Sequence, residues 1–249
     1  MLIRAEGIVI RSNDYGEGNK ILTLYTKEHG KIGVMARGAK KTKSRLSSVA
    51  QLFTYGNFLF YKGAGRGMGS LSQGEPLESF RELRQDLLKT SYAAYFAELT
   101  DKIVEENEPN AYLFRLLVDS FRLLDEDKDA EIVSRLFELK ILSSGGYRPS
   151  LNGCVVCGRT EGYFGFSVQE GGFICERCYH VDPQKLSLQP GTVKILRTLY
   201  LIEPYRLGNI NVKPETRAEL KKVLWFFMDH HTPLRLKSRD FLEKMTKLF

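Results

Sequence analysis

The sequence of 249 residues contains no run of eighteen apolar residues, so nothing in it predicts a membrane-spanning helix. Its first residues, MLIRAEGIVIRS, lack the apolar stretch of a secretory signal. No cysteine lies outside residues 154–178, whereas a small secreted protein would spread its cysteines through a disulfide framework. We therefore expect a protein of the cytoplasm, with reduced cysteines and no membrane partner.

Recognisable catalytic motifs are also missing. The four histidines form no HExxH motif, and no acidic metal cluster or Ser/His/Asp set can be recognised. The glycine run at residues 63–69 lacks the features of a phosphate-binding or dinucleotide-binding loop, so we interpret it as a hairpin turn. We expect no enzymatic activity. An enzyme with an unrecognised site stays an alternative, because catalytic triads cannot be read from sequence position.

Positive charge is concentrated at the two ends of the sequence. The formal net charge of +7 divides into +6 for residues 1–80, −4 for residues 81–150 and +5 for residues 151–249. Basic ends suit a polyanion, and nucleic acid is the usual one. The alternative is that lysine and arginine only keep the surface soluble.

Hydrophobic periodicity divides the chain into a strand-rich start and a helical remainder. Alternation with period two predicts strands at 2–12, 20–25, 31–36, 52–61 and 68–73. Five short strands with glycines at the corners suit a small closed barrel such as the OB-fold. From residue 78 the apolar period becomes three to four, which predicts helices at 83–104, 111–124, 132–142, 192–202, 214–230 and 238–248.

The expected fold class is therefore α+β with more than one domain. Residues 1–78 are predicted to form the OB-fold barrel and to bind nucleic acid. Residues 79–249 are predicted to form a helical domain, into which a cysteine module is inserted at about 150–182.

The cysteines form two CxxC pairs, Cys154/Cys157 and Cys175/Cys178, separated by seventeen residues. This spacing is a strong signal for one tetrahedral zinc ion, because each two-residue gap lets both thiolates reach the same metal. Four thiolates leave no position for water or substrate, so the zinc should be structural and not catalytic. An iron–sulfur cluster, which also uses four thiolates, is the main alternative.

A basic segment joins two of the predicted strands and contains five cations and no acid: Arg37, Lys40, Lys41, Lys43 and Arg45. Binding of single-stranded nucleic acid requires cations along the phosphates and aromatic rings that stack on the bases. We therefore predict that this loop contacts phosphates and is not merely solvated. The next strand supplies rings at Phe53, Tyr55, Phe58, Phe60 and Tyr61. About half of them should be barrel core, and the sequence does not show which half.

Two segments, RAEGIVIRSNDYGEGNKILTLYTKEHGKIGVMARGAKKTKSRL and LKILSSGGYRPSLNGCVVCG, closely resemble the bacterial RecO family of recombination and repair proteins. The resemblance extends over nearly the whole chain. It implies an OB-fold followed by a helical domain with a zinc module. It also implies binding of single- and double-stranded DNA and annealing of complementary strands. Some family members lack the cysteines, but all four are present here.

The resemblance further implies partners. They are RecR, the acidic C-terminal tail of single-stranded DNA-binding protein (SSB), and functionally the recombinase RecA, at the bacterial nucleoid. No motif marks the tail site. We suggest Arg122, Arg135 or Lys140 for this site, because each is a cation beside an apolar stripe. Arg135 and Lys140 belong to the predicted helix 132–142. The alternative function is a zinc-stabilised OB-fold protein that binds RNA or is associated with transcription, and dependence on the 2′-hydroxyl would distinguish it.

Overall fold

A computed structural model of the chain describes residues 1–62 and 67–248. The predicted hairpin turn at 63–69 falls mostly on residues 63–66, which lie outside the described residues. The chain forms two compact units. The first consists of Met1–Glu126 together with the C-terminal segment from Leu236, and the second consists of Asp127–Arg235.

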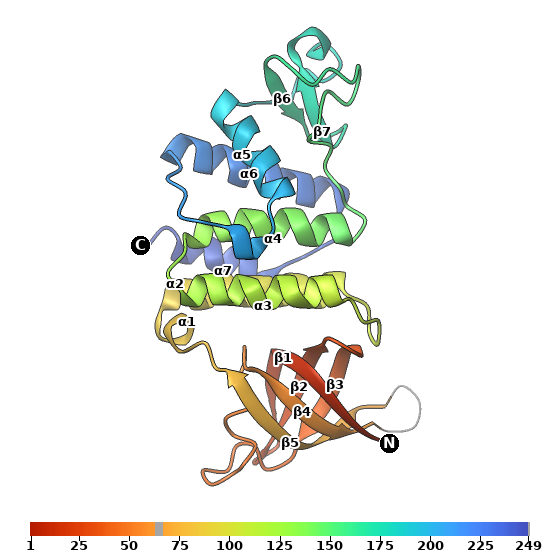
Figure 1. Ribbon diagram of the computed structural model, residues 1–249, viewed down its shortest axis with the longest axis vertical. Coiled ribbons are helices and arrows are strands. Elements are labelled where there is room, and N and C mark those ends of the chain that lie inside the picture. Colours follow the sequence, from red (N-terminus) through yellow and green to blue (C-terminus); the bar gives the residue numbers. More distant parts are fainter. Residues whose placement is uncertain (63–66, 249) are drawn as a thin grey trace. The chain divides into compact units, whose positions relative to one another are not determined.

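The first unit begins with a closed five-stranded barrel (Figure 1), made of β1 (Leu2–Tyr15), β2 (Asn19–Thr26), β3 (Gly30–Ala36), β4 (Tyr55–Tyr61) and β5 (Gly69–Glu78). The strand order is β1-β2-β3-β5-β4, and β4 closes the barrel by pairing with β1. The contact between β3 and β5 is parallel and the other contacts are antiparallel. The predicted barrel is thus confirmed.

Alternating side chains fill the barrel interior, as the period of a strand requires. In β3 the residues Ile32, Val34 and Ala36 are buried, while Lys31, Gly33 and Met35 between them are partly exposed. The other members of this core come from every strand and from the β3–β4 segment: Ile3, Ala5, Val9, Leu22, Leu24, Ala39, Val49, Ala50, Phe58, Phe60 and Leu71.

Four helices complete the first unit: α1 (Arg81–Gln85), α2 (Leu87–Ile103), α3 (Ala111–Asp125) and α7 (Lys237–Met245). One helix was predicted over 83–104, but the structure interrupts it at Asp86, so this prediction was wrong in detail. Asp86 has an extended backbone, and its carboxylate accepts a hydrogen bond from the Lys89 amide at 2.9 Å. This is the N-cap geometry that starts a new helix.

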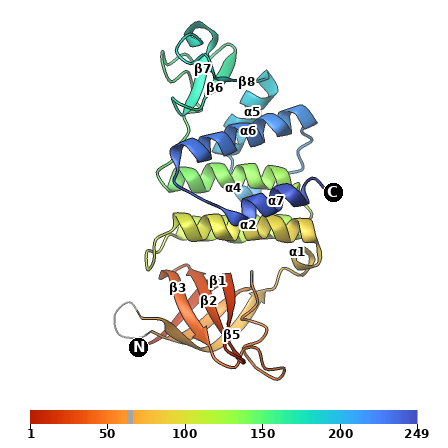
Figure 2. The ribbon, with the colours of Figure 1, turned by 180° about the vertical axis from the view of Figure 1, so that it is seen from behind.

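Helices α2 and α3 cover one end of the barrel (Figure 1), and α7 packs against α2 (Figure 2). Aromatic rings join the two layers. Phe114 of α3 lies 6.0 Å from the ring of Tyr25 and 6.2 Å from that of Tyr55, while Phe53 meets Phe121 edge-on at 5.3 Å. The barrel is therefore closed at this end by an apolar contact, and burial raises the pKa of Tyr25.

The second unit contains α4 (Ala130–Ser144), α5 (Pro190–Leu201) and α6 (Pro214–His231), with short 3₁₀ turns at Glu176–Cys178 and Pro204–Arg206. Helix α4 packs against both α5 and α6. Between α4 and α5 the chain forms a small sheet of order β7-β6-β8, from β6 (Phe164–Ser167), β7 (Gly172–Cys175) and β8 (Leu186–Ser187). This sheet carries the cysteine module.

The predicted fold class is confirmed: a barrel is followed by helices, of which the described residues contain seven α-helices. The compact units divide the chain at Glu126 and Leu236, so a division into domains 1–78 and 79–249 stays a prediction. Within residues 1–62 and 67–248, no helix combines the length and apolar character needed to cross a membrane.

Candidate metal centre and nucleic-acid interface

The four cysteine sulfurs converge on one point. All four Sγ atoms lie within 4.8 Å of one another, and those of Cys157 and Cys175 are 3.6 Å apart. A disulfide would need about 2.05 Å, so these are thiols. Four sulfurs held about 2.3 Å from one tetrahedral ion are about 3.8 Å from each other. The observed spacing therefore fits a shared metal ion.

Backbone geometry brings the sulfurs together. Gly158 has φ +74, a conformation that favours glycine, and its amide donates to the Cys154 carbonyl at 2.8 Å to close the first turn. Strand β7 ends at Cys175, and a 3₁₀ turn then places Cys178 beside it. The Cys175 amide donates to the Cys154 sulfur at 3.3 Å, which ties the two CxxC turns to each other.

The cluster favours an ionised thiol at Cys154. Burial alone would raise the pKa of this thiol, but backbone N–H groups of Cys175, Cys157 and Val156 outweigh it and lower the pKa to about 6. Burial and the neighbouring thiols raise the pKa of Cys178 to about 12. Gathering four thiolates here therefore needs a compensating cation, and thiolates are the form that binds metals.

The residues present fit a structural metal site. Cys154, Cys175 and Cys178 are buried and Cys157 is exposed. In the part of the chain that the structure describes, no other group of His, Cys, Asp and Glu is arranged to hold an ion, and His180 lies outside the cluster. Four sulfur ligands complete a tetrahedron, so such an ion would have no open position for catalysis.

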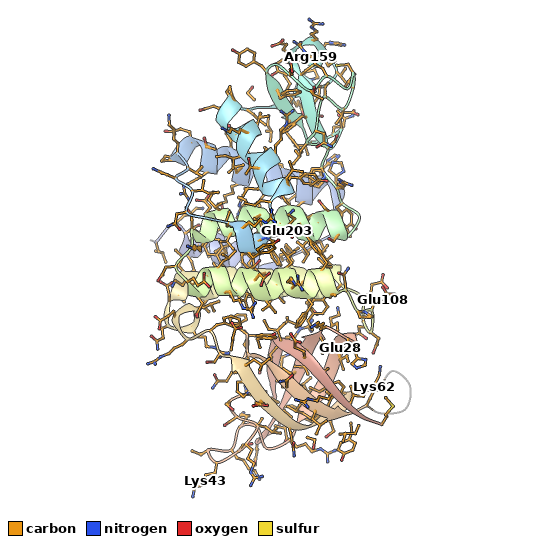
Figure 3. All side chains as sticks on the ribbon, in the orientation of Figure 1. Glu28, Lys43, Lys62, Glu108, Arg159 and Glu203 are labelled. Atoms are coloured by element: carbon orange, nitrogen blue, oxygen red, sulfur yellow. The ribbon has the colours of Figure 1, made fainter. Side chains whose placement is uncertain are left out.

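The predicted cationic loop is held by its apolar residues. It joins β3 to β4, and Ala39, Val49 and Ala50 insert into the barrel core. Its five cations, Arg37, Lys40, Lys41, Lys43 and Arg45, are all exposed. Figure 3 shows Lys43 at the end of the barrel opposite to the end that α3 covers. The loop thus presents its charge to solvent from an anchored base.

Within the described part of the chain, Lys40 is the only one of these cations with a carboxylate partner. Its Nζ lies 2.8 Å from Asp14 Oδ2, and hydrogen bonds from Lys40 and Lys20 lower the pKa of Asp14. Among residues 1–62 and 67–248, no carboxylate lies within 4.0 Å of the other four. Unpaired cations on one loop create the positive potential that attracts phosphates.

The turn between β1 and β2 lies directly beside this loop. The Lys40 amide donates to the Gly18 carbonyl at 3.1 Å, and the Gly38 amide donates to Asn19 Oδ1 at 2.9 Å. Tyr15 ends β1 at this turn and is 54% exposed. The sequence analysis did not single out Tyr15, which the structure shows as an exposed ring beside the cationic loop. The usable signal was an aromatic residue between Asp14 and Gly16, shortly after the predicted strand 2–12.

The strand aromatics are mostly buried. Phe58 and Phe60 lie in the barrel core, whereas Phe53 and Tyr55 pack against α3. Tyr61 alone among the five is exposed, at 55%. The rings of the barrel that can reach a ligand are therefore Tyr15 and Tyr61, with Tyr15 beside the cations.

The three cations suggested for partner binding all have partners within the chain. Arg122 lies 2.6 Å from Glu78 and 3.0 Å from Asp119. Arg135 is 2% exposed, with Nη1 3.0 Å from Glu138 Oε2 and its guanidinium over the Trp225 ring.

Lys140, the third of these cations, donates to the Tyr200 carbonyl at 2.7 Å, and burial lowers its pKa. The apolar residues of α4 beside them, Ile132, Val133, Leu136, Phe137 and Ile141, are buried. A partner site at Arg122, Arg135 and Lys140 stays a prediction.

Known proteins resemble the chain over its full length. The family described as "Recombination protein O N terminal" matches residues 1–80, and "Recombination protein O C terminal" matches residues 84–240. The DNA repair protein RecO of Bacillus pumilus is 50% identical over 248 residues, which cover 100% of this chain and 96% of that protein.

Two further relatives agree with this match. The DNA repair protein RecO of Bacillus subtilis is 49% identical over 248 residues, with 100% of this chain and 96% of the relative covered. That of Listeria monocytogenes is 46% identical over 244 residues, with 98% and 95% covered. The fold, the thiol cluster and these matches agree, and the chain belongs to the RecO family of DNA repair proteins.

Proposed function

We propose that the chain is a mediator of DNA repair and recombination that binds single- and double-stranded DNA through its cationic loop and catalyses no reaction. The observation that carries the proposal is the anchored loop, on which Arg37, Lys41, Lys43 and Arg45 have no carboxylate partner among the described residues. A fixed group of uncompensated cations binds a phosphate backbone through counterion release. Membership of a DNA repair family supports DNA as the polyanion.

The neighbouring ring suits single strands. Tyr15 is exposed beside the loop, so a base can stack on it while adjacent phosphates contact the cations. Strand annealing follows from the same charge, because phosphate repulsion keeps two complementary strands apart and cations reduce it. The chain would thus hold one strand in a form that a second strand can approach.

Zinc is the metal proposed for the thiol cluster. Four sulfur ligands with tetrahedral spacing are a usual zinc set, and the ion would hold the two CxxC turns together. Its contribution is structural, so Cys154, Cys157, Cys175 and Cys178 serve folding of the module and not DNA chemistry.

The proposed protein partners are RecR, RecA and SSB. Together with RecR the chain would help to load RecA onto single strands coated by SSB, and it would recruit SSB through that protein's acidic C-terminal tail. This work belongs in the bacterial cytoplasm at the nucleoid. Family membership supports the repair role, and the partner set rests on the resemblance of the sequence.

The test is annealing of complementary oligonucleotides, bare and SSB-coated, by a variant with Arg37, Lys40, Lys41, Lys43 and Arg45 changed to glutamine. We expect weaker binding on all sequences. The slope of affinity against salt should also become flatter, by about 0.7 for each single-strand phosphate that the variant no longer binds.

The matched control removes five exposed cations elsewhere: Lys213, Lys222, Arg235, Lys244 and Lys247. An unchanged salt slope in the loop variant, with a reduced slope in the control, would move the DNA site to the C-terminal third. A strong preference for RNA over DNA of the same sequence would instead support the RNA-binding alternative.

A further inference from the structure

A pocket of about 500 Å³ lies within the first unit, where β1, α2 and the start of α7 meet. Figure 2 shows α7 alongside α2, at the end of the barrel that α2 covers. A volume of this size is typical of a site for a small molecule. None of the five loop cations that are proposed to bind DNA lines this pocket, so it is a separate feature of the unit.

The two acidic side chains of the pocket are already neutralised within the chain. Asp101 forms an ion pair with Arg11 through Oδ2, and Lys31 Nζ lies 3.4 Å from its Oδ1. Glu98 accepts hydrogen bonds from the first two backbone amides of α7, at 3.3 and 2.7 Å, and so caps the positive end of that helix. Neither carboxylate is left as an uncompensated charge that would repel an anion.

The two lysines of the pocket, by contrast, have no acidic partner. Lys102 and Lys237 are exposed, and no carboxylate of the described residues lies within 4.0 Å of either ammonium group. The side chain of Asn13, which also lines the pocket, makes no hydrogen bond to a residue that the structure describes. Two uncompensated cations and a free amide donor are groups that bind the oxygens of a phosphate.

Another part of the lining is apolar and offers a flat surface. Ala94 and Ala97 lie three residues apart on α2, so they share one face of the helix, and neither side chain extends beyond Cβ. Leu52 and Phe53 also line the pocket. Phe53 has φ +67, a strained conformation for a bulky residue of the kind that gathers at functional sites. A planar ring can lie against such a surface.

We propose that this pocket binds one nucleotide, with its phosphate on Lys102 and Lys237 and its base against Ala94 and Ala97. The lysines alone would suit any anion and the alanine face alone would suit any apolar group, whereas the two together match a phosphate joined to a planar base. The ligand is either a free nucleotide or the 5′-phosphorylated end of a DNA strand, which present the same groups. The inference goes beyond the loop, whose cations contact phosphates along a strand and do not distinguish its end.

The experiment has two arms, both with the full chain. In the first, calorimetry follows titration with deoxyadenosine monophosphate, with deoxyadenosine and with inorganic phosphate. In the second, fluorescence anisotropy compares an oligonucleotide that carries a 5′-phosphate with the same oligonucleotide ending in a 5′-hydroxyl, both labelled at the 3′ end. One pocket variant combines Lys102→Gln with Lys237→Gln, and the other, Ala94→Leu, fills the place of the base.

Each pocket variant has a matched control in the same unit. Lys62→Gln combined with Lys244→Gln removes two exposed lysines that do not line the pocket. Ala111→Leu enlarges an exposed alanine of α3, also outside the pocket. These controls separate the pocket from a general loss of positive charge and from the effect of a larger side chain on a helix.

We expect saturable binding of deoxyadenosine monophosphate, at least about tenfold weaker in both pocket variants and unchanged in both controls, because charge-assisted contacts or the place of the base are lost. A preference for the 5′-phosphate oligonucleotide that disappears in the pocket variants would assign the end of a DNA strand. Equal affinity for both oligonucleotides, with the monophosphate still bound by the pocket, would assign a free nucleotide.

Three results would overturn the proposal. They are binding of inorganic phosphate as tight as that of the monophosphate, equal affinity of wild type and pocket variants for the monophosphate, and a wild type that shows neither monophosphate binding nor a 5′-phosphate preference. Each would leave the DNA-binding loop standing, because the loop is tested by the salt dependence of binding to 5′-hydroxyl strands.

Discussion

Lys40 of the cationic loop lies 2.8 Å from Asp14 at the end of β1, so one of the five loop cations is neutralised within the chain. Asp14 is also 3.1 Å from Lys20. This carboxylate competes with phosphate for Lys40, and it stands next to Tyr15, the exposed ring of the same turn. The interface proposed for DNA therefore contains its own competitor.

Asp14→Asn should strengthen binding of single-stranded DNA modestly, by about two- to fivefold at low salt, because it releases Lys40 from an exposed ion pair and such pairs are weak in water. The gain should fall as salt rises, because exposed charges are screened. The measurement is oligonucleotide affinity across a salt series.

A double-mutant cycle separates release of Lys40 from simple loss of a negative charge. In a Lys40→Gln background the effect of Asp14→Asn should be smaller, whereas Glu17→Gln, an exposed acid of the same turn, should have the same small effect in both backgrounds. Equal gains from Asp14→Asn with and without Lys40 would show that the pair does not matter for DNA.

Removal of one metal ligand should unfold the cysteine module locally. We expect wild type to contain one zinc per chain and Cys175→Ser to contain much less, with lower stability of the second unit, because metal binding and folding are coupled in such sites. Elemental analysis and thermal unfolding are the measurements. His180→Ala is the control, since His180 is exposed and lies outside the sulfur cluster.

Each outcome of the metal analysis is decisive for the zinc assignment. Iron with a visible absorption band would assign an iron–sulfur cluster instead. Wild type that folds fully without metal would show that the four thiols do not serve as a structural site. DNA binding by the loop should change only slightly in Cys175→Ser, because the cysteines and the loop belong to different compact units.

Features set by local pattern could be predicted from the sequence. The alternation of buried Ile32, Val34 and Ala36 with partly exposed neighbours follows from strand period, and it appears in the sequence as KIGVMA. The sulfur cluster could be predicted because each CxxC pair is local in the sequence, and the spacer only has to bring the second pair back beside the first.

Features set by contacts between distant segments could not be predicted. Phe53 and Tyr55 are buried because α3 covers that end of the barrel, and no pattern in the strand itself reports this. Arg122 is tied to Glu78, 44 residues away, so its charge is compensated within the chain. The break at Asp86 was readable in principle, since aspartate is a common helix N-cap, but the apolar period continues through it.

The buried pair of Arg135 and Glu138 should make a large contribution to the integrity of the second unit. Arg135→Met would leave the fully buried Glu138 carboxylate without the guanidinium 3.0 Å away, and should destabilise by about 3–5 kcal/mol. Adding Glu138→Gln to this variant removes the buried negative charge and keeps an acceptor for the Trp225 indole N–H. The double variant should therefore recover part of the lost unfolding free energy. Urea unfolding measures both.

The control for this pair is Arg206→Met, an exposed arginine over Tyr205 in the same unit, which should change stability by less than about 0.5 kcal/mol. If Arg135→Met lowers the unfolding free energy no more than Arg206→Met does, the ion pair makes no net contribution to stability. Failure of the double variant to recover any stability would instead point to the contact of Arg135 with the Trp225 ring.

Stability of the second unit should depend on acid through Asp129. This residue caps α4 by accepting from the Ile132 amide at 3.2 Å, and its Oδ1 and Oδ2 accept from Arg217 at 2.9 and 2.5 Å. Burial alone would raise the pKa of Asp129, but the hydrogen bonds and charge of Arg217 outweigh it and hold the pKa below the usual 3.8. The charged form is therefore favoured by folding.

A carboxyl whose pKa is lower in the folded state stabilises the fold at pH values above its unfolded pKa, and this stabilisation is lost as the pH falls through the folded value. The difference in unfolding free energy between wild type and Asp129→Asn should thus be full at pH 7 and shrink from about pH 5 downward. Glu161→Gln, an exposed acid with no ion pair to the described residues, should show no such trend. A difference that is close to zero at every pH from 7 to 3 would mean that Asp129 acts only as a helix cap, a role that asparagine fills equally well.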